Sequence, residues 1–247
     1  MRFFHKAELK LRALRARLAP LFYSGNAVWC PVCDRTARRF RPAGRGVRRR
    51  EQAACPFCRA KERDRLAVLY FRRHPELFRE GSTDFLHVAP EPELEKFFRA
   101  RCGAGYLSVD IYHPEVMERM DIMDIKKPDA SFDAVYCSHV LQDVPDDALA
   151  LRELFRVLRP NGWAVLNVPL FSSGATHVIE GTNRGDDRPL EQLRHYGEDY
   201  SELLRRTGFE VTVHTADTIR DPAETRNPVL DHPMTGVIHF VRKPAAS

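Results

Sequence analysis

Two short cysteine pairs near the start of the chain constrain its fold more than any other feature. Cys30 and Cys33 form one pair, and Cys55 and Cys58 form the other. A two-residue spacer turns the backbone so that both sulfurs of a pair face one point, and two pairs can complete a tetrahedron around Zn²⁺. We therefore expect a zinc ribbon over residues 28–60. Metal binding is favoured over disulfides because no secretory signal precedes the cysteines and a reducing cytoplasm keeps thiols free.

Positive charge is concentrated in the same part of the chain. Residues 1–65 carry a formal net charge of +13 and the rest carry −8, within a total of +5. Eight arginines lie between the cysteine pairs, at Arg35, Arg38, Arg39, Arg41, Arg45, Arg48, Arg49 and Arg50. This loop either contacts a polyanion such as RNA or forms a solvated basic face. If the ribbon binds no ligand, its metal would still stabilise a module whose hydrophobic core is too small to fold alone.

Apolar residues spaced by three or four positions predict helices on both sides of the ribbon. Leu11, Leu14 and Leu18 repeat in this way in a basic N-terminal segment that ends near Pro20, and residues 61–71 form a second helical pattern. No stretch is long and apolar enough for a membrane span, so we expect a cytoplasmic protein. We expect four segments, namely a basic amphipathic helix in 1–27, the ribbon in 28–60, a linker helix in 61–80 and a larger domain in 81–247.

In the larger domain, short apolar segments alternate with amphipathic ones. The expected strands are 85–88, 106–110, 116–121, 132–140, 163–168, 209–215 and 236–242. The expected helices are 93–101, 146–158 and 199–207. This alternation favours a doubly wound α/β fold with a largely parallel sheet, whose ligands bind at the carboxyl ends of the strands.

Two segments of this domain resemble class I S-adenosylmethionine-dependent methyltransferases. They are Ser-Phe-Asp-Ala-Val-Tyr at 131–136 and Ala-Leu-Arg-Glu-Leu-Phe-Arg-Val-Leu-Arg-Pro-Asn-Gly at 150–162, which looks like the type 11 group. The whole chain is also similar to a subgroup that carries a four-cysteine ribbon. The motifs of that subgroup occur at 86–91 (Leu-His-x-Ala-Pro-Glu), 194–200 (Arg-x-Tyr-Gly-x-Asp-Tyr) and 62–65 (Glu-Arg-x-Arg). The resemblance implies a seven-stranded Rossmann-like methyltransferase sheet and an enzyme that uses S-adenosylmethionine.

The resemblance also implies where this cofactor binds. Asp110, followed by Ile111, stands where the family's acid accepts hydrogen bonds from the ribose hydroxyls. Asp121 occupies the position that meets the adenine amino group, with Asp124 as a competing candidate. The backbone of Ile122 would face the edge of the ring.

The first loop of the domain departs from the family, which has an acid and then glycines there. This chain has His87, Ala89 and Glu91 with two prolines, and prolines stiffen a turn that glycines would leave open. We expect Glu91 to pair with the ammonium group of the cofactor and so to replace the acid missing at His87. The alternative is a catalytically silent scaffold whose basic ribbon binds nucleic acid or a protein partner.

The methyl acceptor is the least determined feature. Ser138 and His139 end the fourth strand, where the family places the transferring methyl group, and His139 is the candidate general base. The Glu-His pair that follows in the subgroup is replaced here by Gln142 and Asp143.

A polar insert over residues 171–197 is expected to cover the acceptor. Its candidate acceptor-binding residues are His177, Glu180, Arg194 and Tyr196, and His195 is a further candidate base. Arg194 and Tyr196 either hold an anionic or sugar-like acceptor or fix the insert to the sheet. RNA is the other acceptor class that we consider, because of the basic ribbon.

Overall fold

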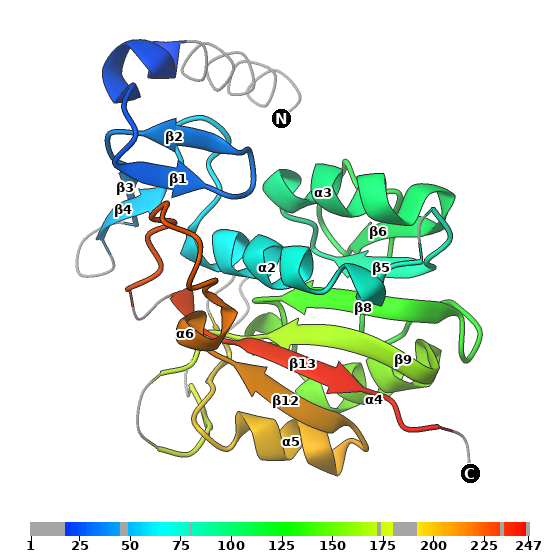
Figure 1. Cartoon of the computed structure of the whole chain (residues 1–247). Coiled ribbons are helices and arrows are strands. Elements are labelled where there is room, and N and C mark those ends of the chain that lie inside the picture. Colours follow the sequence, from blue (N-terminus) through cyan, green and yellow to red (C-terminus); the bar gives the residue numbers. More distant parts are fainter. Residues whose placement is uncertain are drawn as a thin grey trace. The chain divides into compact units, whose positions relative to one another are not determined.

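The chain divides into two compact units in the computed structural model shown in Figure 1. The described residues are 18–44, 49–79, 81–171, 174–179, 192–232 and 235–245. Unit 1 comprises Met1–Arg73 and Ala216–Thr235, and unit 2 comprises His74–Thr215 and Gly236–Ser247. Residues 216–235 were expected in the larger domain but group with the N-terminal residues. The expected boundary at residue 81 stays a prediction.

Unit 1 contains two small antiparallel hairpins and two helices. Its elements are β1 (Val28–Cys30), β2 (Arg35–Ala37), β3 (Arg41–Ala43), β4 (Arg50–Ala54), α2 (Glu62–Arg73) and α6 (Ala216–Ile219). The first cysteine pair lies at the turn between β1 and β2, since Cys30 ends β1, and the second pair begins with Cys55, directly after β4. Of the predicted N-terminal helix, residues 18–23 are helical, and residues 1–17 lie outside the described part.

A buried arginine organises the core of unit 1. The guanidinium of Arg65 in α2 donates hydrogen bonds to the carbonyl oxygens of Ala53 and Ala60 and to those of residues 228 and 229. It also lies 4.4 Å from the ring centroid of Phe40. Because a buried cation must be fully hydrogen-bonded, these contacts hold α2, the second cysteine pair and residues 228–229 together.

Unit 2 contains the predicted seven-stranded sheet. Its strand order is β12-β13-β9-β8-β5-β6-β7, and all neighbours are parallel except β13, which is antiparallel to both of its neighbours. The strands are β5 (Phe85–Val88), β6 (Tyr106–Asp110), β7 (Glu118–Arg119), β8 (Phe132–Ser138), β9 (Leu158–Asn167), β12 (Glu210–His214) and β13 (Ile238–Arg242). The chain runs outward from β5 through β6 to β7 and then returns to β8, beside β5. This reversal of order is a topological switch point.

Helices cover both faces of the sheet in unit 2 (Figure 1). They are α3 (Pro92–Cys102), α4 (Asp147–Val157) and α5 (Tyr200–Arg206). Alternate residues of β5 face opposite ways, as the pleat requires. Leu86 and Val88 pack in an aliphatic core with α4 and α5. Phe85 and His87 face an aromatic layer that contains Phe98 of α3.

Most predicted strands and helices of unit 2 are present, with shifted ends. Residues 159–162 at the end of the type 11 motif lie within β9, where Asn161 has a positive φ of 63°. The sequence did not predict α6 or the hairpin of β10 (His177–Val178) and β11 (Arg194–His195), because segments this short carry no periodic signal. Within the described ranges, no helix combines the length and apolar character that a membrane crossing requires.

Candidate functional site

Two strained residues mark the carboxyl edge of the sheet at the switch point. Ala89 follows β5 with a φ of 47°, and His139 follows β8 with a φ of 58°. The left-handed region costs a non-glycine residue about 1 kcal/mol, and such strain concentrates at ligand sites. Because β5 and β8 are hydrogen-bonded neighbours, both residues lie at one edge of the sheet, where a doubly wound fold forms its ligand-binding crevice. This crevice is the candidate cofactor site.

The structure corrects the expectation for His87 in the first loop. His87 is fully buried, so it has no surface to offer a cofactor. Its Nδ1 lies 2.8 Å from the hydroxyl of Tyr106, and its Nε2 lies 3.1 Å from Oε2 of Glu91. The loop backbone is tied to β6 because the amide of Ala89 donates to the carbonyl of Val109 at 2.8 Å. Glu91 is therefore the acidic group of the loop that remains near its surface, with a side chain 12% exposed.

Asp110 ends β6, as predicted, and shapes the turn that follows. Its Oδ1 accepts hydrogen bonds from the amides of Tyr112 at 2.6 Å and His113 at 2.8 Å. Beside it, the apolar side chains of Ile111, Tyr112 and Met117 are 41%, 62% and 51% exposed. A carboxylate can accept hydrogen bonds from ligand hydroxyls, and exposed apolar side chains beside it can pack on a planar ring. The site therefore suits a ligand that contains both groups.

Asp121 lies close to this site along the backbone. The amide of Met120 donates to the carbonyl of Asp110 at 3.2 Å, and Oδ1 of Asp121 accepts from the amide of Met123 at 2.9 Å. Ile122 is buried, and its backbone role toward a ligand stays a prediction. The competing residue Asp124 instead pairs with Lys126 at an exposed position.

The end of β8 carries a polar cluster around His139. Oγ of Ser138 lies 3.3 Å from Nδ1 of His139, whose amide donates to the carbonyl of Asn167 at 2.7 Å. Nε2 of Gln142 donates to the carbonyl of His139 at 2.6 Å and to Oδ2 of Asp143 at 2.7 Å. Burial raises the pKa of the Asp143 carboxyl. Sequence reasoning did not name Asp143 as a candidate acid or base, although it lies in the short helical turn that follows β8.

Arg194 and Tyr196 are used to anchor the insert. The guanidinium of Arg194 donates to the carbonyl oxygens of Leu141, Val144 and Pro145. The hydroxyl of Tyr196 donates to the carboxylate of Asp147 at 2.6 Å. Both side chains are buried, which favours the second interpretation offered above, that they fix the insert to the sheet.

The described part of the insert exposes a small aromatic surface. The ring of His195 stacks on Phe171 at a centroid distance of 3.9 Å, and His177 meets His195 edge-on at 5.2 Å. His177 is exposed, and Phe171 and His195 are half-buried. Glu180, the remaining candidate of the insert, lies outside the described residues.

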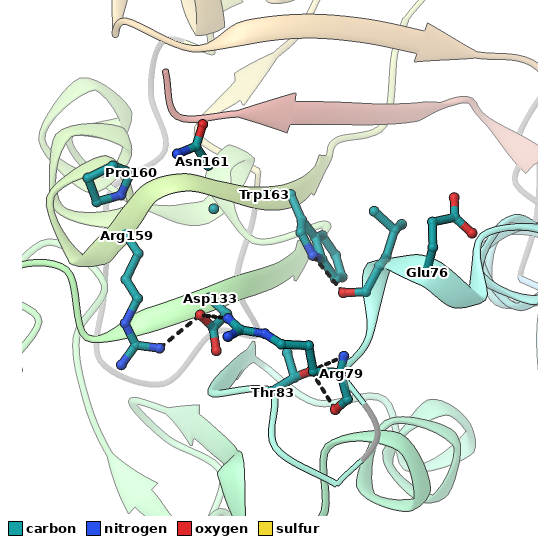
Figure 2. Close-up of a pocket in the computed structure, with 10 residues that line it drawn as sticks. Glu76, Arg79, Thr83, Asp133, Arg159, Pro160, Asn161 and Trp163 are labelled. Carbon is teal, nitrogen blue, oxygen red and sulfur yellow. Dashed lines mark hydrogen bonds and ion pairs between the residues drawn. The ribbon is translucent and has the colours of Figure 1, made fainter. Parts of the chain in front are cut away.

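A cavity lies at the opposite, amino edge of the sheet (Figure 2). It has a volume of about 280 Å³ and contains Arg79, Asp133, Arg159 and Trp163. Its charges are paired internally, because Arg79 and Arg159 both bind Asp133. The indole of Trp163 donates to a backbone carbonyl at 3.1 Å. A cavity with satisfied charges, at the edge away from the strained residues, is not the candidate cofactor site.

The four predicted metal ligands of unit 1 meet in one cluster. The Sγ atoms of Cys30, Cys33, Cys55 and Cys58 all lie within 4.8 Å of one another. The Cys30–Cys58 and Cys33–Cys55 pairs are 3.6 Å and 3.8 Å apart. A tetrahedral site with Zn–S bonds of about 2.3 Å places its sulfurs about 3.8 Å apart. The donor set therefore fits Zn²⁺ in both chemistry and spacing.

The strand order fits the predicted Rossmann-like methyltransferase sheet. Residues 73–166 match a family described as a methyltransferase domain. Over these residues the chain is similar to methyltransferase domains, in agreement with the resemblance drawn from its motifs.

Similar proteins carry related names. A probable S-adenosylmethionine-dependent methyltransferase of Mycolicibacterium smegmatis is 32% identical over 45% of this chain and 39% of its own length. The demethylmenaquinone methyltransferase of Deinococcus radiodurans is 36% identical over 40% of this chain and 36% of its own length. The chain thus spans less than half the length of these relatives. A solved S-adenosylmethionine-dependent methyltransferase from Mesorhizobium loti has a TM-score of 0.49 and 18% identity, covering 71% of this chain and 98% of that one.

Proposed function

We propose that the protein binds S-adenosylmethionine at the switch point of unit 2 and transfers its methyl group to an acceptor. The observation that carries the proposal is the acid Asp110 at the carboxyl end of β6, beside exposed apolar side chains. The match of residues 73–166 to a methyltransferase domain supports it. The strained ends of β5 and β8 support the same crevice.

The residues around the crevice fit the parts of this cofactor. Asp110 would accept from the ribose hydroxyls, and Ile111 would cover the adenine ring together with its exposed neighbours. Asp121 and the backbone of Ile122 would meet the ring edge. Glu91 would receive the ammonium group, because it is the acid of the first loop that reaches the surface.

S-adenosylmethionine supplies a methyl group on a sulfonium, and an in-line displacement forms the acceptor–carbon bond as the sulfur–carbon bond breaks. The protein mainly orients the acceptor and accepts its proton. We assign these roles to the cluster at the end of β8. His139 would take the proton with Ser138 as its partner, and the half-buried carboxyl of Asp143 is the other group placed to do so.

The acceptor is proposed from the described side chains of the insert. Arg194 was a candidate for binding an anion, but its guanidinium is already engaged with backbone carbonyls. The described part of the insert instead presents a partly exposed stack of His195 on Phe171, with the exposed His177 edge-on to it. Stacked rings favour a planar acceptor over a sugar-like one. A base in RNA and a flat metabolite both satisfy this requirement.

Calorimetry with S-adenosylhomocysteine tests cofactor binding. We expect the wild-type protein to bind it and Asp110→Ala to weaken binding at least about tenfold, because two hydroxyl contacts to a charged acceptor are lost. Asp124→Ala is the matched control, since this exposed acid is already paired with Lys126, and its affinity should equal that of the wild type. No binding at millimolar ligand would refute the proposal.

Transfer of a labelled methyl group to a cell extract tests catalysis. We expect label in one fraction when RNA, protein, glycan and metabolite fractions are separated, and none with Asp110→Ala. Cofactor binding without label in any fraction would instead support the silent scaffold.

A further inference from the structure

We propose that a buried hydrogen-bond relay from Tyr106 through His87 positions the Glu91 carboxylate that receives the ammonium group of the cofactor. The inference rests on the proposed function, because it requires S-adenosylmethionine to bind at the first loop. It assigns His87 a positioning role within the protein.

The relay is fixed by distance and by packing. Nδ1 of His87 lies 2.8 Å from the Tyr106 hydroxyl, and Nε2 lies 3.1 Å from Oε2 of Glu91. The imidazole is fully buried in β5. The rings of Phe98 and Tyr136 meet it edge-on, with centroids 5.1 Å and 5.3 Å away. A ring enclosed in this way has one orientation, so its two nitrogens keep their partners.

The chemistry of the three groups determines where the protons lie. A carboxylate only accepts hydrogen bonds, so Nε2 must carry a proton and donate it to Glu91. In the tautomer with its proton on Nε2, Nδ1 is the hydrogen-bond acceptor. The hydroxyl of Tyr106 is then the donor. Burial raises the pKa of Tyr106, which keeps that proton in place.

The Glu91 side chain does not cap its own helix. Glu91 is the N-cap residue of α3, a position from which a Ser, Thr, Asp or Asn side chain accepts from the first amides of the helix. Here the side chain makes no such bond, and the amides of Leu94 and Glu95 instead donate to the backbone carbonyl of Glu91. The carboxylate is drawn toward β5, and among the residues that the structure describes Oε1 has no hydrogen-bond partner. One oxygen is thus held, and the other is available to a ligand.

This arrangement explains the unusual first loop. The motif has a histidine where the resemblance calls for an acid, and an acid four residues later. The hydrogen bond between His87 and Glu91 returns that negative charge to the end of β5. Ala89, which lies between them, has the positive φ that glycine usually provides. The loop therefore has the positive φ and the negative charge that the family's glycine and acid would provide, but they come from Ala89 and Glu91.

Two ligands separate a positioning effect from a loss of packing. S-adenosylhomocysteine contains the ammonium group, and 5′-methylthioadenosine contains the same nucleoside without the amino-acid end. We expect His87→Phe to weaken S-adenosylhomocysteine about tenfold, since one charge-assisted contact is misplaced, and to leave 5′-methylthioadenosine unchanged. His87→Gln retains an amide donor near the Nε2 position and should recover most of the affinity.

Phe98→Leu is the matched control, because it trims the same aromatic layer without removing a hydrogen bond. It should lower the melting temperature while both dissociation constants stay at wild-type values. Tyr106→Phe removes only a hydroxyl, so it tests the relay even if His87→Phe does not fold, and we expect a loss of about threefold for S-adenosylhomocysteine alone.

Equal weakening of both ligands by His87→Phe or Tyr106→Phe, or no recovery with His87→Gln, would overturn the relay while leaving the proposed function intact. A wild-type protein that binds neither ligand would overturn the proposed function itself. Calorimetry for affinity and circular dichroism for folding distinguish these results.

Discussion

A buried histidine couples the stability of unit 2 to pH. His239 of β13 is 2% exposed, and its Nδ1 has no hydrogen-bond partner in the described part of the chain. The ring of Tyr200 meets it edge-on at 4.8 Å. Burial lowers the pKa of His239 from its ordinary value of 6.5 to about 4, because a charged imidazole would lose its hydration there.

The sign of the pH effect follows from this shift. Between pH 6.5 and about 4 the unfolded chain binds a proton at His239 and the folded chain does not, so the free energy of unfolding falls as pH falls. At pH 5 the loss is about 2 kcal/mol. Urea unfolding at pH 7 and pH 5 measures it. His239→Leu should reduce the difference in unfolding free energy between the two pH values by about 2 kcal/mol. His113→Ala, a substitution at an exposed position, should leave this difference unchanged. An equal pH dependence in both variants would contradict the prediction.

Which site residues were predictable depended on local signals. Asp110 and Asp121 were proposed from the resemblance to the methyltransferase family, and Asp110 lies at the end of β6, where the motif puts it. The burial of His87 was missed, although it lies two residues from Phe85 and period-two alternation puts both on one face. The positive φ at Ala89 could not be predicted, because nothing in an alanine or its neighbours specifies the left-handed region.

At the scale of elements, the cysteine cluster was predictable and its surroundings were not. The spacing within each pair is a local signal, and the cluster follows from it. The packing of residues 216–235 in unit 1 depends on contacts distant in sequence. The amide of Trp29 donates to the carbonyl of Asn227 at 2.7 Å, and the guanidinium of Arg226 lies 3.8 Å from the Trp29 ring centroid. Sequence periodicity holds no information on such pairs.

Removal of the metal should unfold the ribbon selectively. Structural zinc contributes about 10 kcal/mol or more to the folding of small modules, and the hairpins of unit 1 have strands of only three to five residues. We expect purified protein to contain one Zn²⁺. Cys30→Ser with Cys55→Ser should abolish amide protection in residues 28–60 while β8 and α4 remain protected, as followed by hydrogen exchange.

Cys102→Ser provides the control for the double substitution, because Cys102 is a buried cysteine of α3 outside the cluster. It should retain the metal and the protection of the ribbon. Wild-type protein that contains no bound metal, or a double variant with unchanged protection in 28–60, would show that the cluster is not a metal site.

At the scale of the whole molecule, charge is divided along the chain. The first 65 residues carry +13 and the remainder −8. Part of the positive charge is used internally, since Arg50 pairs with Glu62 and Arg35 stacks 3.7 Å from the ring centroid of Phe57. Arg38 and Arg39 are exposed, and Arg41 is partly exposed. Within the described ranges, the side chains of these three arginines have no partner. They are the groups available to a polyanion.

We therefore expect the ribbon to bind single-stranded RNA with a strong dependence on salt. With three phosphate contacts, a plot of the logarithm of RNA affinity against the logarithm of salt concentration should have a slope of about −2. RNA affinity should then fall about 20-fold between 50 and 200 mM salt. Replacing Arg38, Arg39 and Arg41 by Gln should flatten the slope toward zero in fluorescence anisotropy. Replacing Arg152, Arg205 and Arg206 of unit 2 by Gln removes the same formal charge, but the salt dependence of RNA binding should stay unchanged. Equal losses in both triple variants would mean that net charge, and not the ribbon surface, attracts the RNA.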